Sequence, residues 1–391
     1  MRILRVTSSM NPSHGGPPQG IRASIQAMAS MGIKNEVACC DAPSAPWMKR
    51  DEFPIHALGP GRFSFSYTRS LTPWLKNNMN RFDAIVLHGM WQWPGLALLR
   101  SAIPRFFLMP HGMLDPWFQR DSSRRAKAVR NWFYWWLAER HIVNRASGVL
   151  FTCEEEMRLA RTTFGSYHPR TEINVGYGIG PAPDFTNKMR SDFAEKLPNL
   201  DGKPYLLFLG RIHPKKGVDL LIRAYEEIIE AQIPKAALPD LVIAGPGWES
   251  AFGKQIREQI NKANSEIRAG STPHIHMAGM LEGNAKWGAL YGCEAFILPS
   301  HQENFGIAVV EALACGRPVL ISNKVNIWRE ISEHGAGLVE DDTIIGTSRL
   351  ILRFSQGELA TTSGKRFRDC FVHHFGIEKA TKNLLTALQS S

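Results

Sequence analysis

Two glutamates that stand eight positions apart, Glu303 and Glu311, are the strongest candidates for chemistry in this sequence. The segment around them has the pattern strand, loop, helix, strand, and the helix should begin between Asn304 and Ile307. The unpaired N–H groups of a helix start attract an anion. Glu303 would lie in the loop ahead of the helix, and Glu311, one turn inside, could accept two hydroxyls of a ribose. A capped, solvated helix is the alternative, but the flanking Asn-Phe-Gly and Gly-Arg-Pro-Val segments favour the ligand site.

A pair of cations, Arg211 and Lys216, forms a second group of candidates. They lie in a loop that follows a hydrophobic run at 205–209 and precedes a helical pattern at 218–225. Open α/β sheets bind ligands at the carboxyl ends of their strands, where Arg211 could hold a diphosphate through a fork of donors and Lys216 as a point charge. An ordinary basic surface loop is the alternative.

The first half of the chain offers a glycine pair and two histidines. Gly15 and Gly16 follow the opening hydrophobic run, and their backbone amides could approach a phosphate or an acceptor, although a plain flexible loop is the competing interpretation. His88 and His111 each follow a hydrophobic run at the expected edge of a sheet. A lone histidine in that position is usually a hydrogen-bonded loop residue, and His88 is the weaker candidate of the two.

These candidates depend on short aliphatic runs, each followed by a turn signal and a helical pattern. Such alternation is typical of a doubly wound α/β protein with buried parallel sheets. The clearest predicted strands are 3–6, 84–87, 105–109, 148–152, 205–209, 241–244, 295–298 and 318–321.

A length of 391 residues is about right for two domains. The glycine- and proline-rich stretch 174–187 has the composition of a linker. We therefore predict one Rossmann-like domain over 1–180 and a second over 188–373. A helical pattern from Ile377 to Leu388 suits docking on either domain, and we expect a C-terminal helix over about 374–391 to pack back on the first.

Composition excludes several classes of protein. Hydrophobic residues at 44% and charged residues at 21% exclude a disordered, collagen-like or coiled-coil chain. No apolar run approaches the ~20 residues of a membrane-spanning helix and the start is too soon polar for a signal peptide, so we expect a cytoplasmic location. The six cysteines lack metal-site spacing and are expected to be buried free thiols. The net charge of +10 suits an anionic ligand, an anionic membrane surface or nucleic acid.

The stretch 118–145 combines many basic residues with a run of aromatic residues. A helically spaced apolar stripe runs through it, formed by Val129, Trp132, Phe133, Trp136 and Leu137. We favour an amphipathic helix whose stripe packs on its own domain. The second interpretation is an interfacial helix over 124–145 that contacts anionic lipid or a lipid-linked substrate, on the inner face of the cytoplasmic membrane. Nucleic acid is not an expected partner, because no binding module accompanies the patch.

The sequence lacks the motifs of metal-dependent diphosphate sites and of nucleotide triphosphatases, and it offers only weak support for a dinucleotide site. None of the aspartates stand two apart, which removes the Asp-x-Asp pair that holds a divalent metal in a different type of diphosphate site. No phosphate-loop motif is present, and the closely spaced glycines at 176–180 lie in the predicted linker, where they support a dinucleotide site only weakly. We therefore expect no metal and no cofactor, and hydride transfer is a poor second hypothesis.

On these residues the chain resembles the retaining glycosyltransferases of family 4, which have the GT-B fold, and the resemblance covers nearly the whole chain. The glutamate pair of that family corresponds to Glu303 and Glu311, its basic glycine loop to 210–217, and its histidine loop to His111. Further similar segments are 15–16, 245–247 and 279–281.

The resemblance implies two Rossmann-like domains that face each other across a cleft, and a role for individual residues. Arg211 and Lys216 would bind the donor diphosphate, Glu303 the transferred sugar and Glu311 the ribose, while His111 would orient the sugar. The backbone around Met280 and Leu281 would meet the base. The implied catalytic residues are His111, Arg211, Lys216 and Glu303, and the implied donor-binding residues are Gly15, Gly16, Gly210, Arg211, Lys216, Gly245, Met280, Leu281, Glu303, Asn304, Phe305, Gly306 and Glu311.

The activity implied by the resemblance is a retaining, metal-independent transfer of a hexosyl unit. The donor would be a nucleotide-diphospho-sugar of UDP, GDP or ADP type, and the acceptor a glycan or a lipid-linked molecule in surface or extracellular polysaccharide assembly, such as that of lipopolysaccharide. No nucleophilic carboxylate is evident, and the resemblance favours front-face attack. A nucleotide-sugar epimerase or a non-catalytic nucleotide-sugar binding protein would use the same fold.

Overall fold

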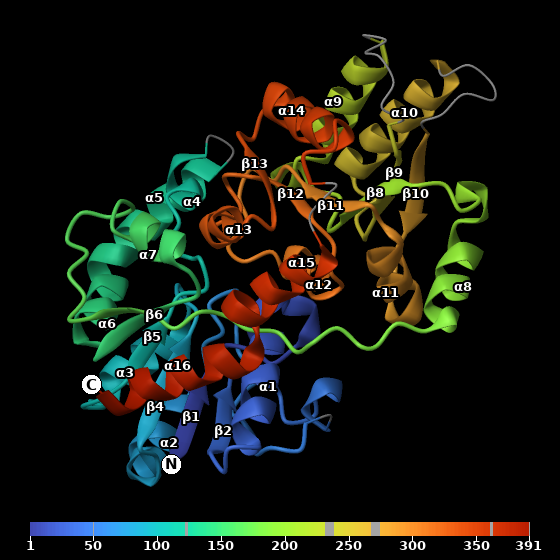
Figure 1. Cartoon of the computed structure of the whole chain (residues 1–391). Coiled ribbons are helices and arrows are strands. Elements are labelled where there is room, and N and C mark those ends of the chain that lie inside the picture. The colour runs from blue at the N-terminus through green and yellow to red at the C-terminus, as the bar shows by residue number, and fades with distance from the viewer. Residues whose placement is uncertain (50, 122–123, 231–237, 267–273, 360–362, 391) are drawn as a thin grey trace. The chain divides into compact units, whose positions relative to one another are not determined.

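The computed structural model describes residues 1–49, 51–121, 124–230, 238–266, 274–359 and 363–390 (Figure 1). It divides into two compact units: unit 1 comprises Met1–Gly180 and Phe375–Ser391, and unit 2 comprises Pro181–His374. Residues 122–123 of the basic aromatic stretch and residue 391 of the expected C-terminal segment lie outside the described residues.

Unit 1 is built on a seven-stranded sheet with the strand order β3-β2-β1-β4-β5-β6-β7. Its strand pairs are parallel, as the predicted doubly wound fold requires. The order reverses between β1 and β4, the usual place for a ligand site in such sheets. The strands are β1 Arg2–Val6, β2 Lys34–Cys39, β3 Ile55–Ala57, β4 Ala84–His88, β5 Phe107–Met109, β6 Gly148–Phe151 and β7 Glu172–Asn174.

Helices cover both faces of the unit 1 sheet, because successive side chains of a strand point to opposite sides. Leu4 and Val6 pack into one cluster with residues of α2, α3 and α6, whereas Ile3 packs into a second cluster with residues of α1 and α16. The helices of unit 1 are α1 Gly16–Ala29, α2 Leu71–Asn78, α3 Trp93–Arg100, α4 Trp117–Arg120, α5 Arg125–Tyr134, α6 Arg140–Arg145, α7 Glu154–Ala160 and α16 Ile377–Ser390.

Unit 2 repeats this architecture with a six-stranded sheet of order β10-β9-β8-β11-β12-β13, again parallel. Helix α9 contacts α10 and α14, and α11 contacts α8 and α12. The strands are β8 Tyr205–Leu209, β9 Asp240–Ala244, β10 Ile275–Gly279, β11 Ala295–Leu298, β12 Val319–Ser322 and β13 Gly337–Glu340. The helices are α8 Asn187–Lys196, α9 Val218–Glu230, α10 Ala251–Glu266, α11 Gly283–Gly292, α12 Ile307–Ala314, α13 Trp328–His334, α14 Ile344–Ser355 and α15 Gly364–Cys370.

All eight of the clearest predicted strands are present, with ends that differ by at most two residues. The strands that the sequence analysis did not single out are β2, β3, β7, β10 and β13. Four of these, β3, β7, β10 and β13, are the edge strands of their sheets, where burial is incomplete and the sequence carries polar residues, as in the Glu-Ile-Asn of β7. The six cysteines are free and buried, which confirms the predicted thiols.

The predicted packing of the basic aromatic stretch is wrong. The side chains of the apolar stripe are exposed: Val129 by 57%, Trp132 by 52%, Phe133 by 57%, Trp136 by 38% and Leu137 by 78%.

A neighbouring face of the same segment is buried instead. It includes Asn131, Trp135 and Ile142, and the Trp135 ring stacks on Phe164 with 4.5 Å between centroids. A π-helical turn over Trp135–Glu139 joins α5 to α6 and rotates the later residues relative to a continuous α-helix. Periodicity revealed an apolar face, but the fold packs a different one.

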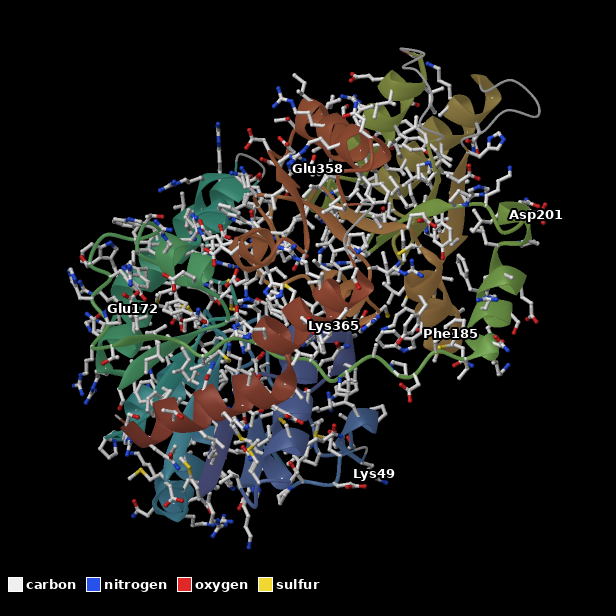
Figure 2. All side chains as sticks on the ribbon, viewed as in Figure 1. Lys49, Glu172, Phe185, Asp201, Glu358 and Lys365 are labelled. Carbon is white, nitrogen blue, oxygen red and sulfur yellow. The ribbon has the colours of Figure 1, made fainter. Side chains whose placement is uncertain are left out.

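Surface charges are paired in both units. Arg161 donates to Glu172 at 2.8 Å in unit 1, and Arg353 donates to Glu358 at 2.6 Å in unit 2, where Figure 2 labels both glutamates. Exposed pairs of this kind each contribute under roughly 1 kcal/mol.

Among the described helices, none is long and apolar enough to cross a membrane.

Glycine is required where loops meet at the carboxyl edge of the unit 2 sheet. Gly245 follows β9 with φ of 138°, and a Cβ atom placed on it would lie 1.8 Å from the carbonyl oxygen of Gly210. Its own N–H donates to the Gly279 carbonyl at 2.7 Å. The loops after β8, β9 and β10 therefore touch through their backbones.

We predict that Gly245→Ala destabilises unit 2 by roughly 2–4 kcal/mol, because the new methyl group clashes with backbone and the φ angle is unfavourable for alanine. Urea unfolding of the full chain measures the change. Gly180→Ala is the matched control, since a Cβ atom there meets nothing within 4 Å. Equal stability of the two variants would contradict the close approach.

Candidate functional site

The loop with the cationic candidates and the loop with Glu303 follow β8 and β11, the two strands of unit 2 between which the strand order reverses. The loop 210–217 comes after β8, the loop 299–306 comes after β11, and these two strands are neighbours in the sheet. Both loops leave the same carboxyl edge because the strands are parallel. This is the position at which doubly wound sheets bind ligands.

Lys215 links the two loops through its backbone carbonyl. That oxygen accepts a hydrogen bond from the His301 N–H and another from the Ser300 hydroxyl, each at 2.9 Å. Gly217 permits the close packing, since a Cβ atom on it would lie 2.1 Å from the Pro299 carbonyl oxygen. The loops are thereby fixed side by side.

Lys216 and Glu303 form an ion pair at this junction. Each side chain is only 17% exposed. The Glu303 backbone is also fixed, because its N–H donates to the Lys324 carbonyl and its carbonyl accepts from the Asn326 N–H, both at 2.9 Å. The two sequence candidates therefore lie in direct contact.

Burial lowers the pKa of Lys216 to about 7, and the positive charges of Lys215 and Arg211 act in the same direction. The Glu303 carboxylate acts against them, because a nearby anion favours the protonated ammonium. Arg211 itself is exposed. The loop thus concentrates positive charge that the single Glu303 carboxylate offsets only in part.

Helix α12 begins directly beside this pair. It starts at Ile307, within the predicted interval, and Gly306 precedes it with φ of 75°. A Cβ atom on Gly306 would lie 3.3 Å from Glu303 Cγ, so the Glu303 side chain packs against the helix start. The positive end of the helix favours the Glu303 carboxylate and would favour any other anion held there.

Glu311 has a partner that the sequence analysis missed. Its Oε1 atom lies 2.7 Å from the ammonium of Lys286, which projects from α11. A lone lysine in another helix gave no sequence signal, because no local pattern connects residues 25 positions apart.

The two candidates between Glu303 and Gly306 are held in place as well. Asn304 Oδ1 accepts a hydrogen bond from the Asn326 side chain at 3.4 Å, and Phe305 is buried.

The remaining unit 2 candidates lie on the loops after β8, β9 and β10. Gly210 donates its N–H to the Ala244 carbonyl at 3.0 Å, beside Gly245. Met280 is 54% exposed, whereas Leu281 is buried. The expected contact of their backbone with a base stays a prediction.

The candidates of unit 1 form a separate group around the switch in strand order between β1 and β4. Gly15 has φ of 85°, and α1 begins at Gly16. The loop before them is held by Asp41, which accepts from the Ser9 hydroxyl and from the Met10 N–H, both at 2.7 Å.

His111 and His88 contact each other, with 2.9 Å between His111 Nε2 and His88 Nδ1. His111 has φ of 52°, an unfavourable angle for histidine, and the Gly112 N–H donates to Glu156 Oε1 at 2.5 Å. Burial, followed by the charge of Arg5, lowers the pKa of His111 to about 4. His111 is therefore neutral at neutral pH.

Among the residues that the structure describes, no three His, Cys, Asp or Glu side chains are grouped so as to hold a metal ion.

Family models match both units. The model for glycosyl transferases group 1 matches residues 189–361, and the model for a glycosyl transferase 4-like domain matches residues 15–175. The chain belongs to the group 1 glycosyltransferases.

Curated relatives of this glycosyltransferase are distant. A D-inositol 3-phosphate glycosyltransferase of Nocardia farcinica is 25% identical over 206 residues, which cover 52% of this chain and 43% of the relative. An uncharacterized glycosyltransferase of Methanocaldococcus jannaschii is 29% identical over 170 residues, 42% of this chain and 40% of the relative. The matches therefore span less than half the length of these relatives.

Solved structures share the fold along the whole chain. Anabaena HepE, in a complex with UDP and glucose, gives a TM-score of 0.73 at 16% identity, with complete coverage of both chains. The sucrose-phosphate synthase of Thermosynechococcus elongatus gives a TM-score of 0.72 at 19% identity, with 100% of this chain and 99% of that chain covered. The predicted GT-B fold is confirmed.

We predict that the affinity of the chain for a nucleoside diphosphate, for which UDP, GDP and ADP are the probes, falls as the pH rises from 6 to 9. The family resemblance assigns the diphosphate to Lys216, and only a protonated ammonium would attract it; burial lowers the pKa of Lys216 to about 7, so this charge is lost across the range. Above the pKa, the Kd should rise by up to roughly tenfold per pH unit. Isothermal titration calorimetry measures the change.

Lys216→Arg is the matched control, because a guanidinium stays charged throughout this range. Its pH dependence should contain only the titration of the nucleotide itself. Lys216→Met, which has no charge at any pH, should bind about tenfold or more weakly at pH 6. Parallel pH profiles for the wild type and Lys216→Arg would show that Lys216 does not hold the diphosphate.

Proposed function

We propose that the protein transfers a glycosyl unit from a nucleoside-diphosphate sugar to a hydroxyl group of an acceptor, with retention of the anomeric configuration. The observation that carries the proposal is the contact of Lys216 with Glu303 beside the start of α12, at the switch point of the unit 2 sheet. Family membership supports glycosyl transfer, and this cluster of charges suits a diphosphate leaving group.

In the proposed reaction, the bond between the anomeric carbon and the diphosphate oxygen breaks, and its electron pair stays with the diphosphate. The acceptor oxygen forms the new bond on the same face of the sugar. The acceptor proton passes to the departing phosphate oxygen. Arg211, Lys216 and the helix start supply preorganised positive charge for the leaving group, which supports a metal-independent reaction.

Lys216 and Glu303 would exchange partners when the donor binds. In the ligand-free protein each charge neutralises the other, which keeps two mostly buried charges from being unpaired. A diphosphate would take over the ammonium of Lys216, and the Glu303 carboxylate would then accept hydrogen bonds from hydroxyls of the sugar. Glu311, held by Lys286, is assigned to the ribose hydroxyls.

We assign acceptor recognition to unit 1. A cavity of about 480 Å³ there is lined by aromatic side chains, among them Phe65, Trp91 and Tyr134, and by the cations Arg124 and Arg130. Flat rings suit a sugar face and the two guanidinium groups suit a phosphate. A phosphorylated or lipid-diphosphate-linked saccharide combines both features.

The test of this function is transfer of radiolabelled sugar from UDP, GDP and ADP donors to lipid-linked and free saccharides, with the anomeric configuration of the product read by NMR. His111→Ala should lower kcat by about 10²-fold, because an orienting contact to the sugar is lost, and should leave the Kd for the nucleotide nearly unchanged.

His141→Ala, a change of an exposed histidine, is the control and should leave kcat unchanged. Full activity of His111→Ala would remove that residue from the mechanism. Conversion of the donor sugar without an acceptor would favour the alternative of an epimerase, and binding of the donor without any turnover would favour a binding protein. The role in surface polysaccharide assembly stays a prediction.

A membrane-bound acceptor is supported by the aromatic face, which we define as Val129, Trp132, Phe133, Trp136 and Leu137. These exposed side chains lie together, with 6.1 Å between the ring centroids of Trp132 and Trp136. Basic residues flank them, and the guanidinium of Arg140 lies 4.4 Å from the centroid of the Trp136 ring. An exposed apolar face bordered by cations is typical of binding to an anionic bilayer surface.

We predict that the protein floats with vesicles that contain anionic phospholipid at low salt, and that binding weakens in high salt because the cations are screened. Trp132→Ser should weaken binding by about tenfold to a hundredfold, since burial of a large apolar side chain contributes roughly 1.5–3 kcal/mol. Phe63→Ser is the matched control, because Phe63 is 86% exposed outside the aromatic face. No flotation at low salt would overturn the membrane proposal.

A further inference from the structure

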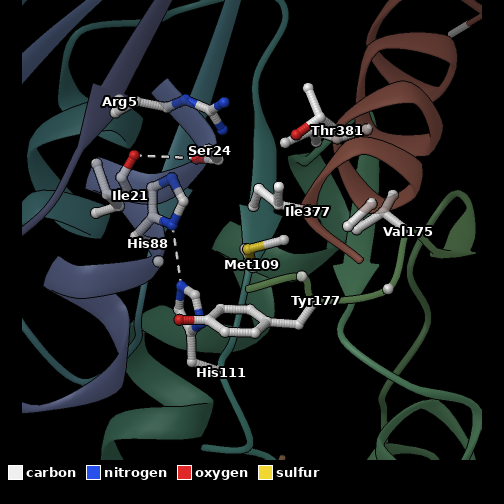
Figure 3. A pocket seen from close by; sticks show the side chains of 15 residues that line it. Arg5, Ile21, Ser24, His88, Met109, His111, Val175, Tyr177, Ile377 and Thr381 are labelled. Atoms are coloured by element: carbon white, nitrogen blue, oxygen red, sulfur yellow. Dashed lines mark hydrogen bonds between the residues drawn. The ribbon is translucent and has the colours of Figure 1, made fainter. Parts of the chain in front are cut away.

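A second cavity in unit 1, of about 30 Å³, lies between β1, α1 and α16 (Figure 3). Most of its lining is apolar and includes Ile21, Met109 and Leu384. Three residues that line it each carry a buried polar atom with no hydrogen-bond partner in the described protein: Arg5 at Nη1, His88 at Nε2 and Thr381 at Oγ1.

Arg5 is a charged residue at a buried position of β1, where an apolar side chain is expected. It follows Ile3 on the same face of β1 and is completely buried. Its Nε donates to Asn35 Oδ1 at 3.1 Å and its Nη2 to Met28 Sδ at 3.2 Å, so both of its partners are neutral. Among the described residues, no carboxylate forms an ion pair with Arg5. Burial lowers the pKa of Arg5 to about 10, which still leaves the group charged at neutral pH.

An unpaired buried charge costs several kcal/mol or more by order of magnitude, and the cost falls sharply when a counter-charge is present. Figure 3 shows the guanidinium extending from β1 into the cavity, with Thr381 of α16 on the other side. Thr381 is 1% exposed, and its hydroxyl can donate. His88, which also lines the cavity, is buried; its Nδ1 is engaged by His111 and its Nε2 has no partner in the described protein.

We propose that this cavity binds a small monovalent anion of the chloride class, held by Arg5, the Thr381 hydroxyl and the Nε2–H of His88. Size supports this occupant, since one water molecule needs roughly 10–15 Å³ of such space and the cavity offers about 30 Å³. A phosphate, a sugar or a nucleotide is too large. A water molecule fits but leaves the charge of Arg5 without a counter-charge.

The anion also sets the protonation of the two histidines. A neutral His88 carries one ring proton, and donation from Nε2 to the anion leaves Nδ1 as an acceptor. That Nδ1 atom then accepts from the Nε2–H of His111, so Nδ1 of His111 carries a lone pair. If the proposed function is right, this atom can accept a hydrogen bond from a sugar hydroxyl, and the anion acts on it through His88.

Bromide soaks of crystals of the full chain test the site directly, because bromide replaces chloride and scatters anomalously. We expect an anomalous peak between Arg5 and Thr381. Bromide peaks on the surface but none in the cavity would overturn the proposal.

Thermal unfolding gives an independent measurement. Sodium chloride is compared with sodium gluconate at equal ionic strength, because gluconate is too large for the cavity. The midpoint for the wild type should rise by roughly 3–5 °C for each tenfold increase of chloride above its Kd, and should stay lower in gluconate. Equal midpoints in the two salts would contradict the site.

Two variants and a control make the test specific. Arg5→Met removes the charge and should abolish the difference between the salts. Thr381→Val keeps the shape and the charge but loses one donor, so the chloride affinity should fall several-fold even if Arg5→Met does not fold. Thr386→Val makes the same change at an exposed position of α16 and should behave as the wild type. None of these readouts uses a nucleotide or an acceptor, so they are separate from the proposed transfer reaction.

Discussion

Backbone segments that touch without intervening side chains hold the carboxyl edge of the unit 2 sheet together. The carbonyl of Gly210 occupies the place of a side chain on Gly245, and the carbonyl of Pro299 occupies the place of one on Gly217. Because these loops pack so closely, Lys216 and Glu303 meet although 87 positions separate them. The charge distribution beside α12 depends on this packing.

The sequence was informative where local physics decides the outcome. Central strands are buried on both faces and therefore read as continuous aliphatic runs, whereas β3 and β7 have three residues each and carry polar side chains. The start of α12 at Ile307 followed from the strand, loop, helix pattern around Glu303. Lys216 and Glu303 were chosen as candidates for separate parts of a ligand, but their contact was not predicted, because it depends on how two loops pack.

Two further misses also depend on tertiary packing. The partnership of Glu311 with Lys286 joins two helices, and no spacing rule within one helix reports it. In the basic aromatic stretch, periodicity identified an apolar face correctly but could not show whether the fold covers it. The π-helical turn over Trp135–Glu139 and the stack of Trp135 on Phe164 place a different face inside.

Helix α16 completes the core of unit 1, although it follows the whole of unit 2 in the chain. Leu384 and Leu388 of this helix belong to the same apolar cluster as Ile3, and Arg105 donates to the Leu388 carbonyl at 2.6 Å across 283 positions. Ribosomes deliver a chain from its N-terminus at about 5–20 residues per second, and domains generally fold as they emerge. The core of unit 1 is complete only when α16 has been synthesised. Unit 2 lies between the two segments of unit 1 in the chain and can fold earlier. The apolar cluster around Ile3 therefore closes only after the whole of unit 2 has been synthesised, because Leu384 and Leu388 follow unit 2 in the chain.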